Sequence, residues 1–156
     1  MTEYEKLLDD ANKEDVTVIE SYNFISDRLK GLYCDGSIAL NKELKTESEK
    51  KCVLAEELGH HYTTSGNIID IKNTENRKQE HRARVWAYRK ALSLSDLVSA
   101  YKRGCKNRYE IAEYLNVTES FLSDAIEHYK SEYGLCTKID NYIIYFEPLG
   151  VLELNV

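Results

Sequence analysis

The chain has 156 residues, of which 42% are hydrophobic and 31% are charged, and its formal net charge is −6. These values are typical of a soluble globular protein with one core, so a single domain over residues 1–156 is expected. The negative charge argues against unassisted nucleic-acid binding, because phosphate contacts need clustered cations. No apolar run approaches the roughly 20 residues that span a bilayer, and the acidic N-terminus resembles no signal peptide. A cytoplasmic location is therefore expected.

Three short elements are predicted at the start of the chain. Residues 3–12 have the apolar spacing of a short amphipathic helix. Residues 15–20 fit either a strand or the beginning of a short helix. Residues 22–29 have apolar residues at helical spacing and are predicted to form a helix.

The next segment has the pattern of a β-hairpin. Residues 32–34 and 37–41 flank Asp35-Gly36, which is a favourable two-residue turn. The second strand of this hairpin leads directly into a long helix predicted over residues 46–66.

Several signals support the helix over residues 46–66. Thr46 and Glu49 form a capping box at its start, and Gly66 is a plausible end. Gly59 lies in its interior, where glycine costs about 1 kcal/mol relative to alanine. A glycine at this place suggests that another group approaches the helix backbone closely.

This helix carries the residues that indicate chemistry. Its centre reads Glu-Glu-Leu-Gly-His over residues 56–60, one residue away from the H-E-x-x-H pattern of zinc peptidases. Glu56 and His60 are four residues apart, so both could bind one ion from one helix face. Glu57 would lie beside that ion and could accept a proton from its water.

Other interpretations of these residues remain open. Glu57 and His61 are also four residues apart and could form a different site. Glu56 and Glu57 could instead belong to a solvated helix face that binds no metal. Cys52, one turn before Glu56, could face the metal or could be a small core residue. The cysteines in general form no C-x-x-C pair and are expected to be free thiols: Cys34, Cys52, Cys105 and Cys136.

Helices are predicted to dominate the second half of the chain. A second long helix is expected over residues 74–92, and a third over 96–103, capped by residues 93–96. A helix pair follows over residues 108–115 and 119–133, with Thr118 as the N-cap of its second helix.

The chain is predicted to end in a second hairpin. Its strands flank a turn at Asp140-Asn141, and Pro148 is predicted to end it.

The helix pair over residues 108–133 also resembles a helix-turn-helix, which raises DNA binding as an alternative function. Its second helix is acidic, however, so the pair is interpreted as part of the scaffold.

Two segments resemble the ImmA/IrrE metallopeptidases, in particular their short forms from phages and integrative elements. Residues 54–63 read LAEELGHHYT and resemble the family's active-site helix, and residues 80–87 read EHRARVWA and resemble a segment of its next helix. The resemblance extends over essentially the whole chain. It implies an α+β fold: a minimal zincin-like domain with small hairpins on an active-site helix, a helix-turn-helix-like pair and a C-terminal hairpin.

The resemblance also implies a set of site residues. Glu56, His60 and Glu80 would be the metal ligands and Glu57 the general base. It favours His60 over His61, because the family places glycine directly before its second histidine. The chain departs from the family where Glu56 replaces the first histidine. Two carboxylates weaken the metal as a Lewis acid and admit manganese or iron besides zinc.

The implied activity is cleavage of a repressor protein of the helix-turn-helix type, which would derepress genes of a mobile element. The substrate is expected along an edge strand, for which residues 37–41 are the candidate. His61, His81 and His128 are possible auxiliary groups. The alternative is a catalytically weak or metal-free protein that only binds a repressor.

Overall fold

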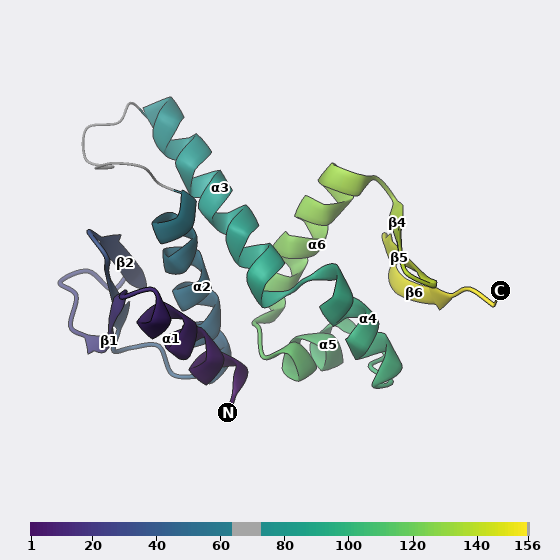
Figure 1. The fold of residues 1–156 in the computed structure, drawn as a ribbon, viewed down its shortest axis with the longest axis horizontal. Helices are drawn as coiled ribbons and strands as arrows, with labels where there is room; N and C mark the ends of the chain where they lie inside the picture. Colours follow the sequence, from purple (N-terminus) through teal and green to yellow (C-terminus); the bar gives the residue numbers. More distant parts are fainter. Residues whose placement is uncertain (64–72, 156) are drawn as a thin grey trace. The chain divides into compact units, whose positions relative to one another are not determined.

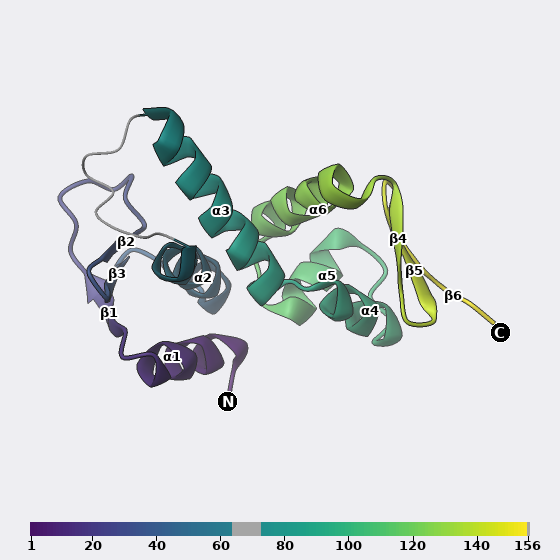
Figure 2. The same cartoon turned by 45° about the horizontal axis from the view of Figure 1, so that its top comes forward.

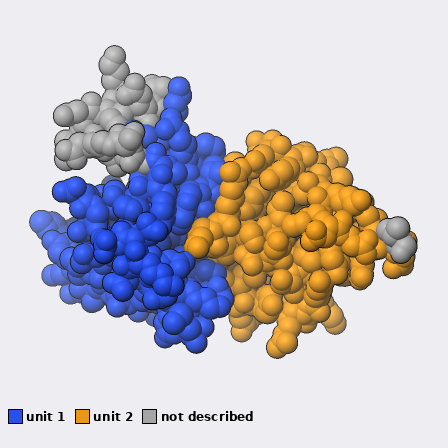
Figure 3. All heavy atoms as spheres, in the orientation of Figure 1, with its two compact units in different colours: residues 1–87 blue, residues 88–156 orange. Residues whose placement is uncertain are grey.

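The computed structural model describes residues 1–63 and 73–155, with side chains from residue 76 onward in the second range. The fold is mixed α+β. The chain divides into two compact units, residues 1–87 and 88–156 (Figure 3). The single domain over residues 1–156 stays a prediction. The expected helix end at Gly66 lies outside the described residues.

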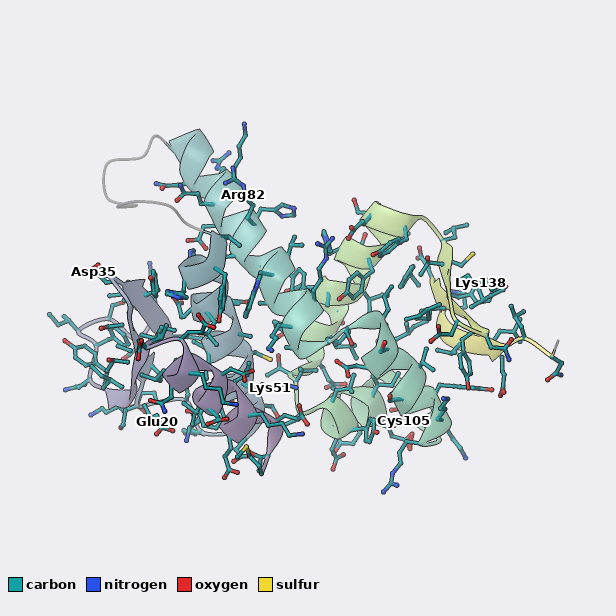
Figure 4. The ribbon with its side chains drawn as sticks, viewed as in Figure 1. Glu20, Asp35, Lys51, Arg82, Cys105 and Lys138 are labelled. Carbon is teal, nitrogen blue, oxygen red and sulfur yellow. The ribbon has the colours of Figure 1, made fainter. Side chains whose placement is uncertain are left out.

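The first unit begins with α1 (Glu3–Lys13), which confirms the first predicted helix. Thr2 and Glu5 form a capping box, so two backbone N–H groups at its start have acceptors. The apolar face of α1 is buried, and the hydroxyl of its Tyr4 donates to Glu20 at 2.9 Å. Glu20 is labelled in Figure 4. This bond ties α1 to the strand that follows it.

A three-stranded sheet comes next, in the order β1-β3-β2. It contains β1 (Thr17–Tyr22), β2 (Gly31–Cys34) and β3 (Ser37–Asn41). The β2–β3 hairpin is confirmed, and both turn residues, Asp35 and Gly36, have the positive φ that such a turn requires. The role of residues 37–41 as an edge strand was wrong, because β1 pairs with β3 in parallel and places β3 in the centre.

The helix predicted over residues 22–29 was also wrong. Tyr22 ends β1, and the following segment is irregular. Ile25 and Leu29 are exposed, so their helical spacing does not face a core. The segment instead accepts hydrogen bonds from the end of β3. The side-chain amide of Asn41 donates to the carbonyl of Leu29 at 2.8 Å, and the backbone N–H of Lys42 donates to the carbonyl of Tyr22 at 2.9 Å.

Two long helices complete the first unit. They are α2 (Glu47–Thr63) and α3 (Asn73–Ala91), which continues across the boundary between the units. Both were predicted, and the expected N-cap is present, since the Glu49 N–H donates to Thr46 Oγ1 at 3.1 Å. The α2 helix packs on α1, β2 and β3, and it lies between the sheet and α3 (Figures 1 and 2).

The second unit contains three short helices, each with a side-chain cap. Ser93 caps α4 (Leu94–Lys102), Asn107 caps α5 (Arg108–Leu115) and Thr118 caps α6 (Glu119–Tyr133). Asn116 joins α5 to α6 in a left-handed conformation, which asparagine tolerates better than most residues. The predicted helix pair is therefore confirmed as two capped helices.

A small antiparallel sheet ends the chain. It contains β4 (Cys136–Ile139), β5 (Tyr142–Phe146) and β6 (Leu149–Glu153), in that order. The predicted hairpin corresponds to β4 and β5. The sequence did not reveal β6, because Pro148 was interpreted as the end of the ordered hairpin. The sheet packs against α4 and α6, with Ile144 and Phe146 fully buried.

Candidate active site

The structure brings together His60 on α2 and Glu80 on α3. His60 Nε2 lies 3.4 Å from Glu80 Oε1. The His60 residue is only 8% exposed, and its Nδ1 is buried without a hydrogen-bond partner. Glu80, by contrast, is exposed. The pair therefore joins a buried imidazole to a carboxylate that solvent can reach.

Gly59 allows the two helices to approach at this point. A Cβ atom at residue 59 would lie 2.3 Å from the backbone oxygen of Ala83 on α3, which is far inside van der Waals contact. Ala83 is itself small and buried. The prediction of a close backbone approach at Gly59 is therefore confirmed, and the approach places His60 beside Glu80.

Glu57 lies on the β2 side of α2. A Cβ atom at Gly31 would lie 3.1 Å from Glu57 Cγ and 3.2 Å from its Oε1, so the glycine leaves room for this side chain. Burial raises the pKa of Glu57 to about 7, and the negative charges of Glu56 and Glu80 act in the same direction. The charge of His60 opposes them. A carboxyl that titrates near neutral pH is suited to proton transfer.

The His60–Glu80 pair has its own electrostatic signature. The hydrogen bond to Glu80 raises the pKa of His60 against the effect of burial. The same bond lowers the pKa of Glu80. Glu56 and Glu57 add further negative charge that also raises the pKa of His60. Three carboxylates, those of Glu80, Glu57 and Glu56, thus raise the pKa of this one imidazole.

The pair fits two ligands of one metal ion. Two donors bound to one tetrahedral zinc at its usual bond lengths lie roughly 3.3 Å apart, and His60 Nε2 lies 3.4 Å from Glu80 Oε1. An imidazole and a carboxylate are also donors that zinc, manganese and iron accept. Among the described residues, however, no group of three histidines, cysteines or acids is arranged to hold a metal. The role of Glu56 as a third ligand therefore stays a prediction.

Sequence reasoning did not single out Tyr33 among the 12 tyrosines. The Tyr33 hydroxyl lies 2.8 Å from His61 Nδ1 and accepts a bond from the backbone N–H of Gly36 at 3.2 Å. The backbone of Tyr33 also hydrogen-bonds to Glu57. This bond lowers the pKa of Glu57 and so opposes the effect of burial. Only the pairing of β2 with its neighbours could have revealed these contacts.

The remaining candidates have other surroundings. His81 is exposed on α3, and Cys52 is buried on α2, as expected of a core residue. His128 belongs to the second unit, where its Nε2 lies 3.1 Å from Glu132. All four cysteines are free thiols, as predicted. Next to the site, Trp86 of α3 stacks on Tyr62 of α2, with ring centroids 4.8 Å apart.

Comparison with known proteins gave one family. Residues 11–127 match the IrrE N-terminal-like domain, Peptidase_M78. No curated protein and no solved structure matched the chain. Within the described part of the chain, no helix has the length and apolar character needed to cross a membrane. The matched range contains all of α2 and α3, and with them the paired His60 and Glu80. The chain therefore belongs to the ImmA/IrrE peptidase family.

Proposed function

We propose that this protein is a metal-dependent endopeptidase that cleaves a repressor of the helix-turn-helix type. The observation that carries the proposal is the position of Glu57. It is a half-buried carboxyl with a pKa of about 7, one helical turn from His60 of the His60–Glu80 pair. Such a group has few uses in a scaffold, whereas a hydrolase needs it as a base.

The proposed chemistry assigns a role to each residue. His60 and Glu80 would hold the metal, with Glu56 completing the set. When bound, the metal would polarise the peptide carbonyl and lower the pKa of a water molecule. Glu57 would accept the proton of the attacking water and return it to the leaving amine. Burial against Gly31 would keep its carboxyl in a fixed orientation.

The substrate would lie along β2 in an extended conformation. β2 pairs only with β3 among the described strands, so a further strand could add to its other edge, although the Tyr33 backbone already hydrogen-bonds to Glu57. The same strand touches the site, because Gly31 borders Glu57 and Tyr33 contacts His61. A peptide on this edge would have its backbone beside the base and the metal ligands. The hydroxyl of Tyr33 would then be placed to bind the oxygen that develops charge.

A cleavage assay tests the proposal. The purified protein, supplied with zinc or manganese, is incubated with a purified repressor of the helix-turn-helix type, and the products are identified by mass spectrometry. We expect a single internal cut. Glu57→Gln should reduce the rate by about 10²–10⁴-fold, because it keeps the size of the side chain and removes the base.

The matched control is Glu113→Gln, which alters an exposed glutamate on α5 in the second unit. This variant should cleave at the wild-type rate. Equal rates for Glu57→Gln and the wild type would refute the role of Glu57 and would favour the alternative register with His61.

A second candidate is a metal-free protein that binds a repressor without cutting it. The direct contact of His60 with Glu80 favours it, because the two groups can satisfy one another without an ion. In this case the repressor would co-purify intact with the wild type, and elemental analysis would find no metal. DNA binding by the α5–α6 pair has less support, because α6 exposes Glu119, Asp124 and Glu127. A gel shift at low salt would test it.

A further inference from the structure

A pocket of about 360 Å³ lies within the second unit, between α4, α5 and β6. Its volume falls in the range of sites for small molecules, roughly 300–1,000 Å³. Cys105, labelled in Figure 4 on the connection between α4 and α5, lies on its wall. None of the residues assigned to the peptidase site lines this pocket.

One wall of the pocket comes from a part of the chain that the family match does not include. The match ends at residue 127, whereas Leu149 and Val151 belong to β6. The opposite wall is formed by Leu97 of α4 and Ile111 of α5. These four side chains give the pocket an aliphatic lining. Membership of the peptidase family therefore does not account for it.

The charge at the pocket is opposite to that of the protein. Its lining contains Lys106 and Arg108 but no acidic residue, although the net charge of the chain is −6. Arg108 Nη1 donates to Ser123 Oγ at 3.3 Å. Among the described residues, the Lys106 ammonium has no partner, whereas the nearby Glu110 carboxylate accepts the Lys106 backbone N–H at 2.8 Å. Two cationic head groups thus lie beside an aliphatic pocket, and that of Lys106 is not held by a hydrogen bond in the described part of the chain.

We propose that this pocket binds a small monoanionic amphiphile, an aliphatic carboxylate. Its hydrocarbon chain packs against Leu97, Ile111, Leu149 and Val151, and its carboxylate pairs with the Lys106 ammonium. Burial of the hydrocarbon supplies the affinity, and the charge supplies the selectivity.

Calorimetric titration of the full chain with octanoate, and with octan-1-ol as its neutral counterpart, tests the proposal. Octanoate should bind saturably at one site and at least about tenfold more tightly than octan-1-ol, as expected for a charge-assisted contact. Lys106→Glu should weaken octanoate binding by at least about tenfold and leave octan-1-ol binding unchanged. Lys106 is exposed, so this change should not disturb folding.

The matched control is Lys138→Glu, which makes the same charge change on β4 of the same unit. Lys138 does not line the pocket and lies away from Cys105 in Figure 4. It should leave both affinities unchanged. Leu149→Trp should fill the pocket and abolish binding of both probes, with folding checked by circular dichroism. The proposal is overturned if octanoate does not saturate, if octan-1-ol binds as tightly, or if the two lysine variants lose equal affinity.

Discussion

Each compact unit contains a histidine paired with a glutamate, and the two pairs differ in what surrounds them. In the first unit, His60 Nε2 lies 3.4 Å from Glu80. In the second, His128 Nε2 lies 3.1 Å from Glu132, one turn away on the same helix. Glu132 also accepts a hydrogen bond from the guanidinium of Arg89. A permanent cation therefore balances the second pair, which needs no further partner.

In the first pair, the charge of Arg84 also lowers the pKa of Glu80, but further acidic groups lie around His60. Glu56 and Glu57 add two carboxylates close enough to influence the pKa of His60. The buried polar and charged side chains of the described residues, Asn41, Lys51 and His60, also all belong to the first unit. The comparison teaches that a His–Glu contact alone does not indicate function. What distinguishes the first pair is the added negative charge of Glu56 and Glu57 and the buried Nδ1 of His60, which cost stability unless a ligand offsets them.

The largest expected difference between the pairs is in metal content. Protein prepared without chelator should contain about one divalent ion per chain. His60→Ala should abolish this signal, because it removes the one imidazole among the proposed ligands. His128→Ala should retain it. Elemental analysis of the three proteins measures the outcome, and equal metal content in all of them would refute the assignment of His60.

The next difference concerns stability and pH in the metal-free protein. The fold raises the pKa of Glu57 from an ordinary value of 4.5 to about 7. Its contribution to stability is therefore complete below pH 4.5 and is lost as the pH rises through about 7. Glu57→Gln should make chelator-treated protein more stable than the wild type at pH 8, by about 3 kcal/mol, and should have little effect at pH 4.5. Urea denaturation at both pH values measures this change.

Glu132→Gln is the control in the second unit, and its effect should have the opposite sign. Hydrogen bonding to Arg89 lowers the pKa of Glu132, so its charged form is favoured by the fold. The substitution should lower stability at pH 8, by at most about 1 kcal/mol for an exposed pair. Stabilisation by both substitutions, or by neither, would contradict the distinction between the two pairs.

A third, smaller effect concerns a buried hydroxyl in the second unit. Tyr129 is 1% exposed, and its hydroxyl donates to the backbone oxygen of Leu92 at 2.7 Å, whereas the buried Nδ1 of His60 has no partner. Tyr129→Phe should therefore lower the free energy of unfolding by about 1–2 kcal/mol. Metal content should not change. If Tyr129→Phe lost metal but kept its stability, the Tyr129 hydroxyl would serve the metal site and not the fold of the second unit.

Sequence reasoning succeeded where signals are local. The caps at Thr46 and Thr118 and the turn at Asp35-Gly36 act over a few residues, and the corresponding elements are present. It failed where contacts between segments distant in the sequence determine the structure. The parallel pairing of β1 made β3 a central strand, and bonds to Asn41 replaced the helix expected over residues 22–29.

The candidate site divides in the same way. The spacing of Glu56, Glu57 and His60 within one helix could be interpreted from sequence, and the family resemblance supplied Glu80. Gly31 and Tyr33 escaped notice, because their importance follows from the packing of β2 on α2. Neither residue carries a pattern of its own in the sequence.

The last prediction tests the unusual residue of the site. Glu56→His restores the H-E-x-x-H pattern and removes one of the three carboxylates around His60. An imidazole suits zinc better than a carboxylate does, and fewer negative charges leave the ion a stronger Lewis acid. We expect zinc to be retained about tenfold more tightly, or ~1.4 kcal/mol, with equal or higher cleavage activity. Glu113→His in the second unit should change neither quantity. Chelator titration followed by the cleavage assay measures both, and an unchanged zinc affinity would remove Glu56 from the ligand set and favour the metal-free repressor-binding protein.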